Sequence, residues 1–186
     1  MDLVEEHRSV EELVRLFVRQ AKDWAEANAE RIGIAYESAG GWELWLEVEL
    51  YVWLRQRVPS LAVSRQSHGY AEGAQRADLL LGDRVVVELK AETREETARA
   101  FADRVEKDRA KVDRVDEKQL DIDWSYEEGD AASEESDASD GSGGGATPAV
   151  IVAFAVSTAG TRAVSGLGDF VTMPAGTLTI LWELTG

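Results

Sequence analysis

Two charged side chains interrupt an apolar stretch near the middle of the chain. The run Val85–Lys90 is apolar except at Glu88 and Lys90. Residues two apart in a strand share a face, so both charges point to the same side as Val86. If a helix covers that side, a carboxylate and an ammonium each cost several kcal/mol of desolvation unless they pair or meet a metal. Such a costly arrangement indicates function.

A second carboxylate, Asp78, precedes Glu88 by ten residues, and the turn between them decides whether the two meet. Short apolar runs on either side of Gly82-Asp83-Arg84 predict a β-hairpin. A three-residue loop would set Asp78 directly opposite Glu88, with both side chains on one face. A two-residue turn would pair Asp78 with Val87 instead, unless a bulge restores the first alignment.

The spacing D-x9-E-x-K of Asp78, Glu88 and Lys90, between two predicted helices, resembles the PD-(D/E)xK superfamily of restriction-endonuclease-like nucleases. The resemblance covers most of the chain, although Ala77 stands where the motif's name has proline. It implies an α-β-β-β-α-β core, a mixed sheet flanked by helices. It also implies that Asp78 and Glu88 bind Mg²⁺ or Mn²⁺ together with the Leu89 carbonyl. Lys90 would orient or activate the attacking water.

The residue types suit this chemistry independently of the resemblance. Hydrolysis of a phosphodiester requires neutralisation of the charge that grows on the non-bridging oxygens, and a nucleophile that behaves like hydroxide. A carboxylate-held Mg²⁺ performs both tasks, and hard oxygen ligands suit that ion. Lys90, close to metal and phosphate, can stabilise the transition state or help to deprotonate water.

Members of this superfamily often add a glutamate from the first core helix, and the predicted helix over 42–57 offers three. At about 100° per residue, Glu49 falls on the aromatic face with Trp45, whereas Glu43 and Glu47 fall away from it. Glu49 also begins an E-L-x-x-x-L pattern typical of such helices. We therefore expect Glu49 among the catalytic and metal-binding residues. The alternative is an amphipathic helix whose Glu49 reaches solvent or pairs with a local arginine.

Basic residues recur at spacings of three or four on the helix predicted after Lys90, and they form one flank of it. They are Arg104, Lys107, Lys111, Arg114 and Lys118. Of these, the first four, with His68 on the first predicted strand, are the candidate contacts to a nucleic acid. Asp108 lies in the apolar stripe of the same helix. The alternative is a solvated helix whose own acids pair with these bases.

The elements that must position these residues follow from periodicity and capping signals. The predicted helices cover 9–28, 42–57 and 93–115, and the predicted strands cover 61–70, 77–81, 85–90, 149–157 and 177–184. Capping boxes open the first and third helices. The prediction is a single α/β domain, 1–186, with a restriction-endonuclease-like core and an extra N-terminal helix. An acidic, then Gly- and Ser-rich stretch, 120–147, is expected to be a disordered insertion within it.

The net charge of −16 is concentrated rather than spread. Residues 116–140 contain eleven acids and one base and carry −10 of it. The chain has five Lys against fifteen Arg, and this acid-rich, lysine-poor balance resembles proteins of extreme halophiles. In molar salt the Debye length falls to about 3 Å, so repulsion from a nucleic acid would be screened. The alternative is an ordinary acidic protein.

Composition excludes several other classes of chemistry. The chain has no Cys and two His, which argues against disulfides, thiol catalysis and multi-histidine metal sites. No window approaches the roughly 18 apolar residues of a membrane span. The acidic beginning of the chain lacks the basic region of a signal peptide. These observations predict a cytoplasmic protein with no membrane partner.

The leading hypothesis is a Mg²⁺-dependent endodeoxyribonuclease with DNA as its partner. Double-strand cutting commonly uses two active sites and would favour a homodimer, and a protein partner could supply sequence specificity. One alternative is a catalytically inert protein of the same fold, or an acidic adaptor that binds a basic partner through residues 116–140. Another is that Glu88 and Lys90 form an exposed ion pair on an edge strand, worth at most about 1 kcal/mol.

Overall fold

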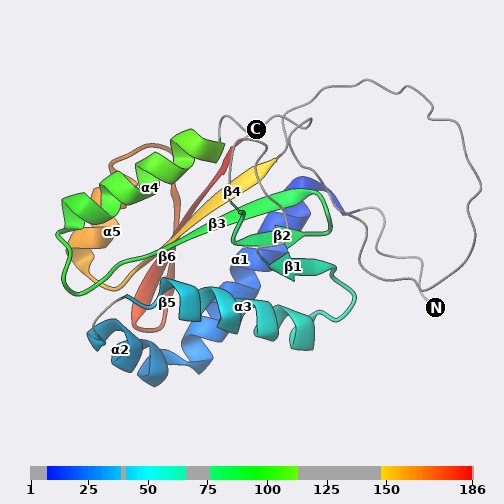
Figure 1. Cartoon of the computed structure of the whole chain (residues 1–186), viewed down its shortest axis with the longest axis horizontal. Helices are drawn as coiled ribbons and strands as arrows, with labels where there is room; N and C mark the ends of the chain where they lie inside the picture. The colour runs from blue at the N-terminus through cyan, green and yellow to red at the C-terminus, as the bar shows by residue number, and fades with distance from the viewer. Residues whose placement is uncertain (1–7, 39–40, 66–75, 113–147, 186) are drawn as a thin grey trace, which may run out of the picture.

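The computed structural model describes residues 8–38, 41–65, 76–112 and 148–185, which form a six-stranded sheet with helices on both faces (Figure 1). The strands are β1 (Val63–Arg65), β2 (Leu79–Leu81), β3 (Val85–Ala91), β4 (Ala149–Ala155), β5 (Val171–Ala175) and β6 (Leu178–Thr185). The helices are α1 (Val10–Ala27), α2 (Ala29–Glu37), α3 (Glu43–Arg57), α4 (Ala98–Val112) and α5 (Thr158–Ser165). The protein therefore belongs to the mixed α/β class, as the sequence predicts.

The strand order is β1-β2-β3-β4-β6-β5. β3 and β4 are parallel, and every other neighbouring pair is antiparallel. Helix α4 belongs to the connection between the two parallel strands, which a tight turn cannot join. β3 and β4 thus form the centre of the sheet, with two strands on each side.

The core has one layer on each face of the sheet. Alternation along β3 sends Val85, Val87 and Leu89 into a cluster with residues of α1, α2 and α3. Val86 points the other way and packs in a second cluster with Phe101 of α4. Glu88 and Lys90 share the side of Val86, so they lie on the α4 face of the sheet.

A buried carboxylate at the end of β3 fixes the β4–α5 connection. Glu92 is 3% exposed and accepts hydrogen bonds from the backbone N–H groups of Val156 and Ser157, each at 2.7 Å, and from the Ser157 hydroxyl. An added Cβ at Gly160 would lie 2.6 Å from the Glu92 carboxylate. The Glu92 carbonyl accepts the indole N–H of Trp42 at 2.8 Å, which ties the start of α3 to the same point.

The predicted helices form, with one shift of boundary. α1 begins with the expected capping box, in which Ser9 and Glu12 bond each other's backbone N–H groups. The box expected at Thr93 is half made, because Glu96 accepts the Thr93 N–H at 2.7 Å. Helix α4 nevertheless begins at Ala98, and its cap is Thr97, whose hydroxyl accepts the Ala100 N–H at 3.2 Å.

Three elements have no counterpart among the predictions. α2 follows α1 after the single residue Asn28 and buries only Ile32, so it has little apolar periodicity. α5 is rich in small residues and buries only Gly160 and Val164. β5 contains Pro174 and lies at the edge of the sheet, where a missing N–H is tolerated.

Several predictions lie outside the described residues. They are the insertion 120–147, the second half of the strand over 61–70 and the end of the helix after Val112. Within the described part of the chain, no helix has the length and apolar character needed to cross a membrane.

Candidate functional site

The β2–β3 turn combines features of both alternatives that the sequence leaves open. Gly82 and Asp83 have φ values of 56° and 54°, and the Arg84 N–H donates to the Leu81 carbonyl at 3.1 Å. The reversal is thus made at Gly82-Asp83, as in a two-residue turn. Arg84 is an additional residue, however, so Leu81 pairs with Val85, as in the three-residue alternative.

This register brings the two predicted carboxylates together. Leu79 pairs with Val87, and Asp78, the residue just before β2, comes close enough to Glu88 for the two charges to act on each other. Asp78 Oδ2 accepts the Leu89 N–H at 2.7 Å, which fixes the Asp78 side chain against β3. Burial, and next the negative charge of Glu88, raise the pKa of Asp78 from 3.8 to about 7.

Glu88 is almost completely buried and is paired across to α4. It is 2% exposed, and its Oε1 lies 2.8 Å from Nζ of Lys111. A carboxylate with so little access to water requires a cation close by, because the desolvation cost otherwise exceeds what folding supplies. Lys111 is such a cation.

Lys90 lies at the centre of a second ion-pair group, and its side chain is 13% exposed. Its Nζ donates to Glu43 Oε1 at 2.9 Å and to the Leu89 carbonyl at 2.8 Å, and it lies 2.8 Å from Asp108 Oδ2. Burial alone would lower the pKa of Lys90, but the charges and hydrogen bonds of Glu43 and Asp108 outweigh it and raise that pKa above its usual value. Lys90 is therefore a firmly charged ammonium.

Glu43 is a site residue that sequence reasoning assigned to the wrong side of its helix. Besides Lys90, it accepts the Ala91 N–H at 3.0 Å and lies 2.6 Å from Arg104 Nη2. Arg104 also pairs with Glu96 at 2.9 Å. The available signal is position, since Glu43 is the first residue of α3 and this end of the helix meets the end of β3.

Glu49 does not face the site, contrary to the expectation from the sequence. Glu49 pairs with Arg31 of α2 at 2.7 Å, the alternative that the sequence also allowed. Glu47 is the buried glutamate, 4% exposed, and lies 2.6 Å from Arg65 of β1. An angular projection of the sequence places the tryptophans on the inward face of α3. The fully buried stripe instead consists of Leu46, Leu50 and Leu54, one helical turn apart.

The predicted basic flank of α4 is largely directed into the protein. Arg104 and Lys111 pair with the carboxylates of Glu43 and Glu88, so they do not form a continuous exposed ridge. Lys107 is exposed. Arg114 and His68, also expected as nucleic-acid contacts, lie outside the described residues.

The residues that could hold a metal are Asp78, Glu88 and the Leu89 carbonyl. Among the described residues, no group of three or more acidic or histidine side chains could hold a metal ion. Two carboxylates are nevertheless a normal protein contribution to Mg²⁺, which keeps several waters and binds substrate phosphate. Burial, and next the negative charge of Glu88, raise the pKa of Asp78; a cation would offset the second of these, so the two carboxylates suit a hard divalent ion.

A cavity of about 490 Å³ opens beside Glu43 and Arg104, between the start of α3 and the β3–α4 connection. Glu43 and Arg104 line its inner side, and Thr93 and Arg94 line the connection. Lys90 reaches the cavity only through Glu43, which lines the cavity and accepts a hydrogen bond from the Lys90 ammonium.

Comparisons of the chain with protein-family models, with curated proteins and with solved structures find no significant match.

Proposed function

We propose that the protein is a metal-dependent nuclease that hydrolyses phosphodiester bonds of DNA, of the PD-(D/E)xK type. The observation that carries the proposal is that Asp78, the residue just before β2, lies close enough to Glu88 of β3 for the two charges to act on each other, with Lys90 two residues further along β3. Two carboxylates and an ammonium on one face of a sheet are the groups that this hydrolysis requires.

The order of elements supports the same proposal. The succession α3-β1-β2-β3-α4-β4, with strands in the order β1-β2-β3-β4 and β4 parallel to β3, is compatible with an α-β-β-β-α-β core. Helices α1 and α2 precede this unit, and α5, β5 and β6 follow it. This order of elements supports the places that the resemblance implies for the motif hairpin and the two helices around it.

Asp78, Glu88 and the Leu89 carbonyl would hold Mg²⁺ or Mn²⁺. When bound, such an ion supplies neutralising charge for the phosphate oxygens and a water of lowered pKa. Asp78 is held for this role by the Leu89 N–H, and Glu88 by the ladder register.

Lys90 would act through its charge and not as a base. Its pKa is raised, so it keeps its proton at neutral pH. Such an ammonium can donate a hydrogen bond to the attacking water and stabilise negative charge that develops on the phosphate. Glu43 and Asp108 are then positioning residues, because they hold the Lys90 ammonium from two different helices.

The test is cleavage of plasmid DNA with Mg²⁺, at low and at multi-molar KCl. We expect Lys90→Met and Glu88→Gln to lose at least a hundredfold of the rate, while Glu49→Gln, the control on the far side of α3, keeps it. Circular dichroism checks that the variants remain folded. Absence of cleavage by the wild-type protein with either Mg²⁺ or Mn²⁺, or unchanged cleavage by both site variants, would contradict the proposal.

A second candidate function is favoured by the ion pairs at the site. Lys90 forms ion pairs with Glu43 and Asp108, and Lys111 forms an ion pair with Glu88. Because these charges already compensate one another, the arrangement also suits an inert protein of this fold. Such a protein would act as an adaptor and bind a basic partner through its acidic stretch. Deletion of 116–140 distinguishes the two, because an adaptor loses its partner and a nuclease keeps its chemistry.

A further inference from the structure

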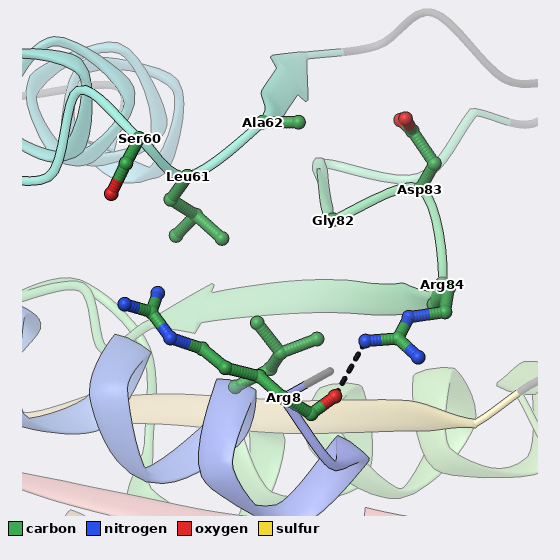
Figure 2. Close-up of a pocket in the computed structure, with 8 residues that line it drawn as sticks. Arg8, Ser60, Leu61, Ala62, Gly82, Asp83 and Arg84 are labelled. Carbon is green, nitrogen blue, oxygen red and sulfur yellow. Dashed lines mark hydrogen bonds between the residues drawn. The ribbon is translucent and has the colours of Figure 1, made fainter. Parts of the chain in front are cut away.

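A second cavity lies at the β2–β3 turn, whereas the candidate site lies toward the other end of β3. It has a volume of about 280 Å³ and is lined by Arg8, two residues before α1, by Leu13 of α1, by the α3–β1 connection and by the β2–β3 turn (Figure 2). Arg84 precedes β3, whereas Lys90 is near its end, and at roughly 3.3 Å per residue the two lie about 20 Å apart along the strand. The cavity is thus a separate feature.

Two guanidinium groups face this cavity, from Arg8 and Arg84 (Figure 2). The Arg84 side chain is anchored, because its Nη2 donates to the Arg8 carbonyl at 2.5 Å. Nη1 of Arg8 is buried and has no hydrogen-bond partner among the described residues. A guanidinium keeps its proton in proteins, so this N–H group cannot avoid the cost by becoming neutral. A buried donor without an acceptor indicates a missing acceptor.

The positive charges of Arg8 and Arg84 are not neutralised by the acidic side chain that lines the cavity. Within the described residues neither Arg8 nor Arg84 forms an ion pair, although the chain has 36 acids against 20 Lys and Arg. Asp83 also lines the cavity, but its carboxylate points away from Arg8 (Figure 2). The cavity therefore combines two positive charges with a carboxylate that does not reach them.

We propose that this cavity binds a phosphate group, with the Arg8 and Arg84 guanidiniums as its two charged donors. The planar fork of a guanidinium matches the oxygens of phosphate in a bidentate pair, which suits Arg better than Lys. Ser60 supplies a hydroxyl at the rim, and Leu13 and Leu61 supply an apolar wall for the rest of the ligand. The phosphate is carried either by a small phosphorylated molecule or by a nucleic-acid backbone.

The experiment compares wild type, Arg8→Met, Arg8→Lys and Arg55→Met, with EDTA present so that no metal contributes. Arg8 is the informative position because its guanidinium Nη1 has no partner to lose, so the fold should survive its removal. Arg55 is an exposed arginine on α3 and is the control. Calorimetry measures binding of inorganic phosphate at constant ionic strength, and fluorescence anisotropy measures binding of a short DNA duplex.

We expect Arg8→Met to weaken phosphate binding at least tenfold, Arg8→Lys to weaken it less, and Arg55→Met to leave it unchanged. If inorganic phosphate does not bind but the duplex binds with the same dependence on Arg8, the phosphate comes from a nucleic-acid backbone. If neither probe depends on Arg8, the proposal is wrong. A Lys90→Met variant keeps phosphate binding, which separates this outcome from that of the nuclease proposal.

Discussion

Asp78 is the residue whose protonation reports most directly on the charge of the site. Its pKa is raised to about 7 by burial and by Glu88, so the folded protein binds this proton more tightly than the unfolded chain does. The stability contributed in this way is present below about pH 4 and is lost as pH rises through about 7. In metal-free protein, ionised Asp78 therefore destabilises the fold most at neutral and alkaline pH.

Asp78→Asn should remove the part of the pH dependence of stability that Asp78 contributes. Asparagine keeps an oxygen that can accept the Leu89 N–H, but it does not ionise. With EDTA present, the Tm of the variant should rise relative to wild type between pH 4 and pH 8. Thermal denaturation across that range measures the difference. A gap between the two proteins that is independent of pH would contradict the assignment.

Lys111 has two expected roles, as the cation that compensates buried Glu88 and as a group that a divalent ion would have to displace or share. Lys111→Met removes this ion pair and should destabilise the metal-free protein by about 3 kcal/mol, because a buried carboxylate loses its cation. Added Mg²⁺ should recover much of that loss. Urea denaturation with and without Mg²⁺ measures both effects.

Lys107→Met is the matched control for this variant, since Lys107 is an exposed lysine on the same helix. Its stability should stay within about 0.5 kcal/mol of wild type. A Lys111→Met protein as stable as this control, or one that Mg²⁺ does not restore, would show that Lys111 does not compensate Glu88 in the expected way.

At the level of elements, the site depends on how the ends of α3, β3 and α5 meet. Glu92 joins β3 to the β4–α5 connection, and its neighbour across the contact is Gly160. There is no room for a Cβ at Gly160, because it would lie 2.6 Å from the Glu92 carboxylate. A side chain at position 160 would therefore have to displace a carboxylate that three hydrogen bonds hold in place.

Gly160→Ala should accordingly destabilise the protein by about 1–3 kcal/mol through overpacking. Gly33, in the middle of α2, has nothing within 4 Å of an added Cβ and provides the matched helical control. Gly33→Ala should stabilise by roughly 0.5–1 kcal/mol, because alanine loses less conformational freedom in a helix. Urea denaturation distinguishes them, and two changes of the same sign would refute the packing argument.

The elements that the sequence predicted are those with a strong local signal. The hairpin β2–β3, the buried strand β4 and the capping box of α1 are each specified by residues close to one another in the chain. The orientation of α3 is not specified locally. Trp45 and Leu46 are equally apolar, and only the packing against β3 decides which of them is fully buried. The roles of Glu43 and Asp108 depend on that long-range packing and could not be derived locally.

At the scale of the whole molecule, the dominant property is the net charge of −16. Like charges on a compact chain repel one another, and salt screens that repulsion. The described surface ion pairs, such as Arg99 with Asp103 at 3.9 Å, are weakened by the same salt, but exposed pairs contribute little. The balance favours a protein that salt stabilises.

We therefore expect the Tm to rise by several degrees between about 0.1 M and about 2 M KCl, where the Debye length falls from roughly 10 to below 3 Å. Sucrose at equal osmolality is the control that separates screening from exclusion of solute at the protein surface. A Tm that is constant in KCl, or that rises no more than in sucrose, would show that the acidity of the chain does not limit its stability.

We propose that Asp78 and Glu88 together form a site for a divalent cation beside β3. The most direct measurement is calorimetric titration of Mg²⁺ into the wild-type protein, Glu88→Gln and the control Glu49→Gln, at low and at multi-molar KCl. We expect binding to the wild type and to Glu49→Gln, and at least a tenfold loss of affinity in Glu88→Gln. Binding that is unchanged in Glu88→Gln, or absent from the wild type at every salt concentration, would contradict it.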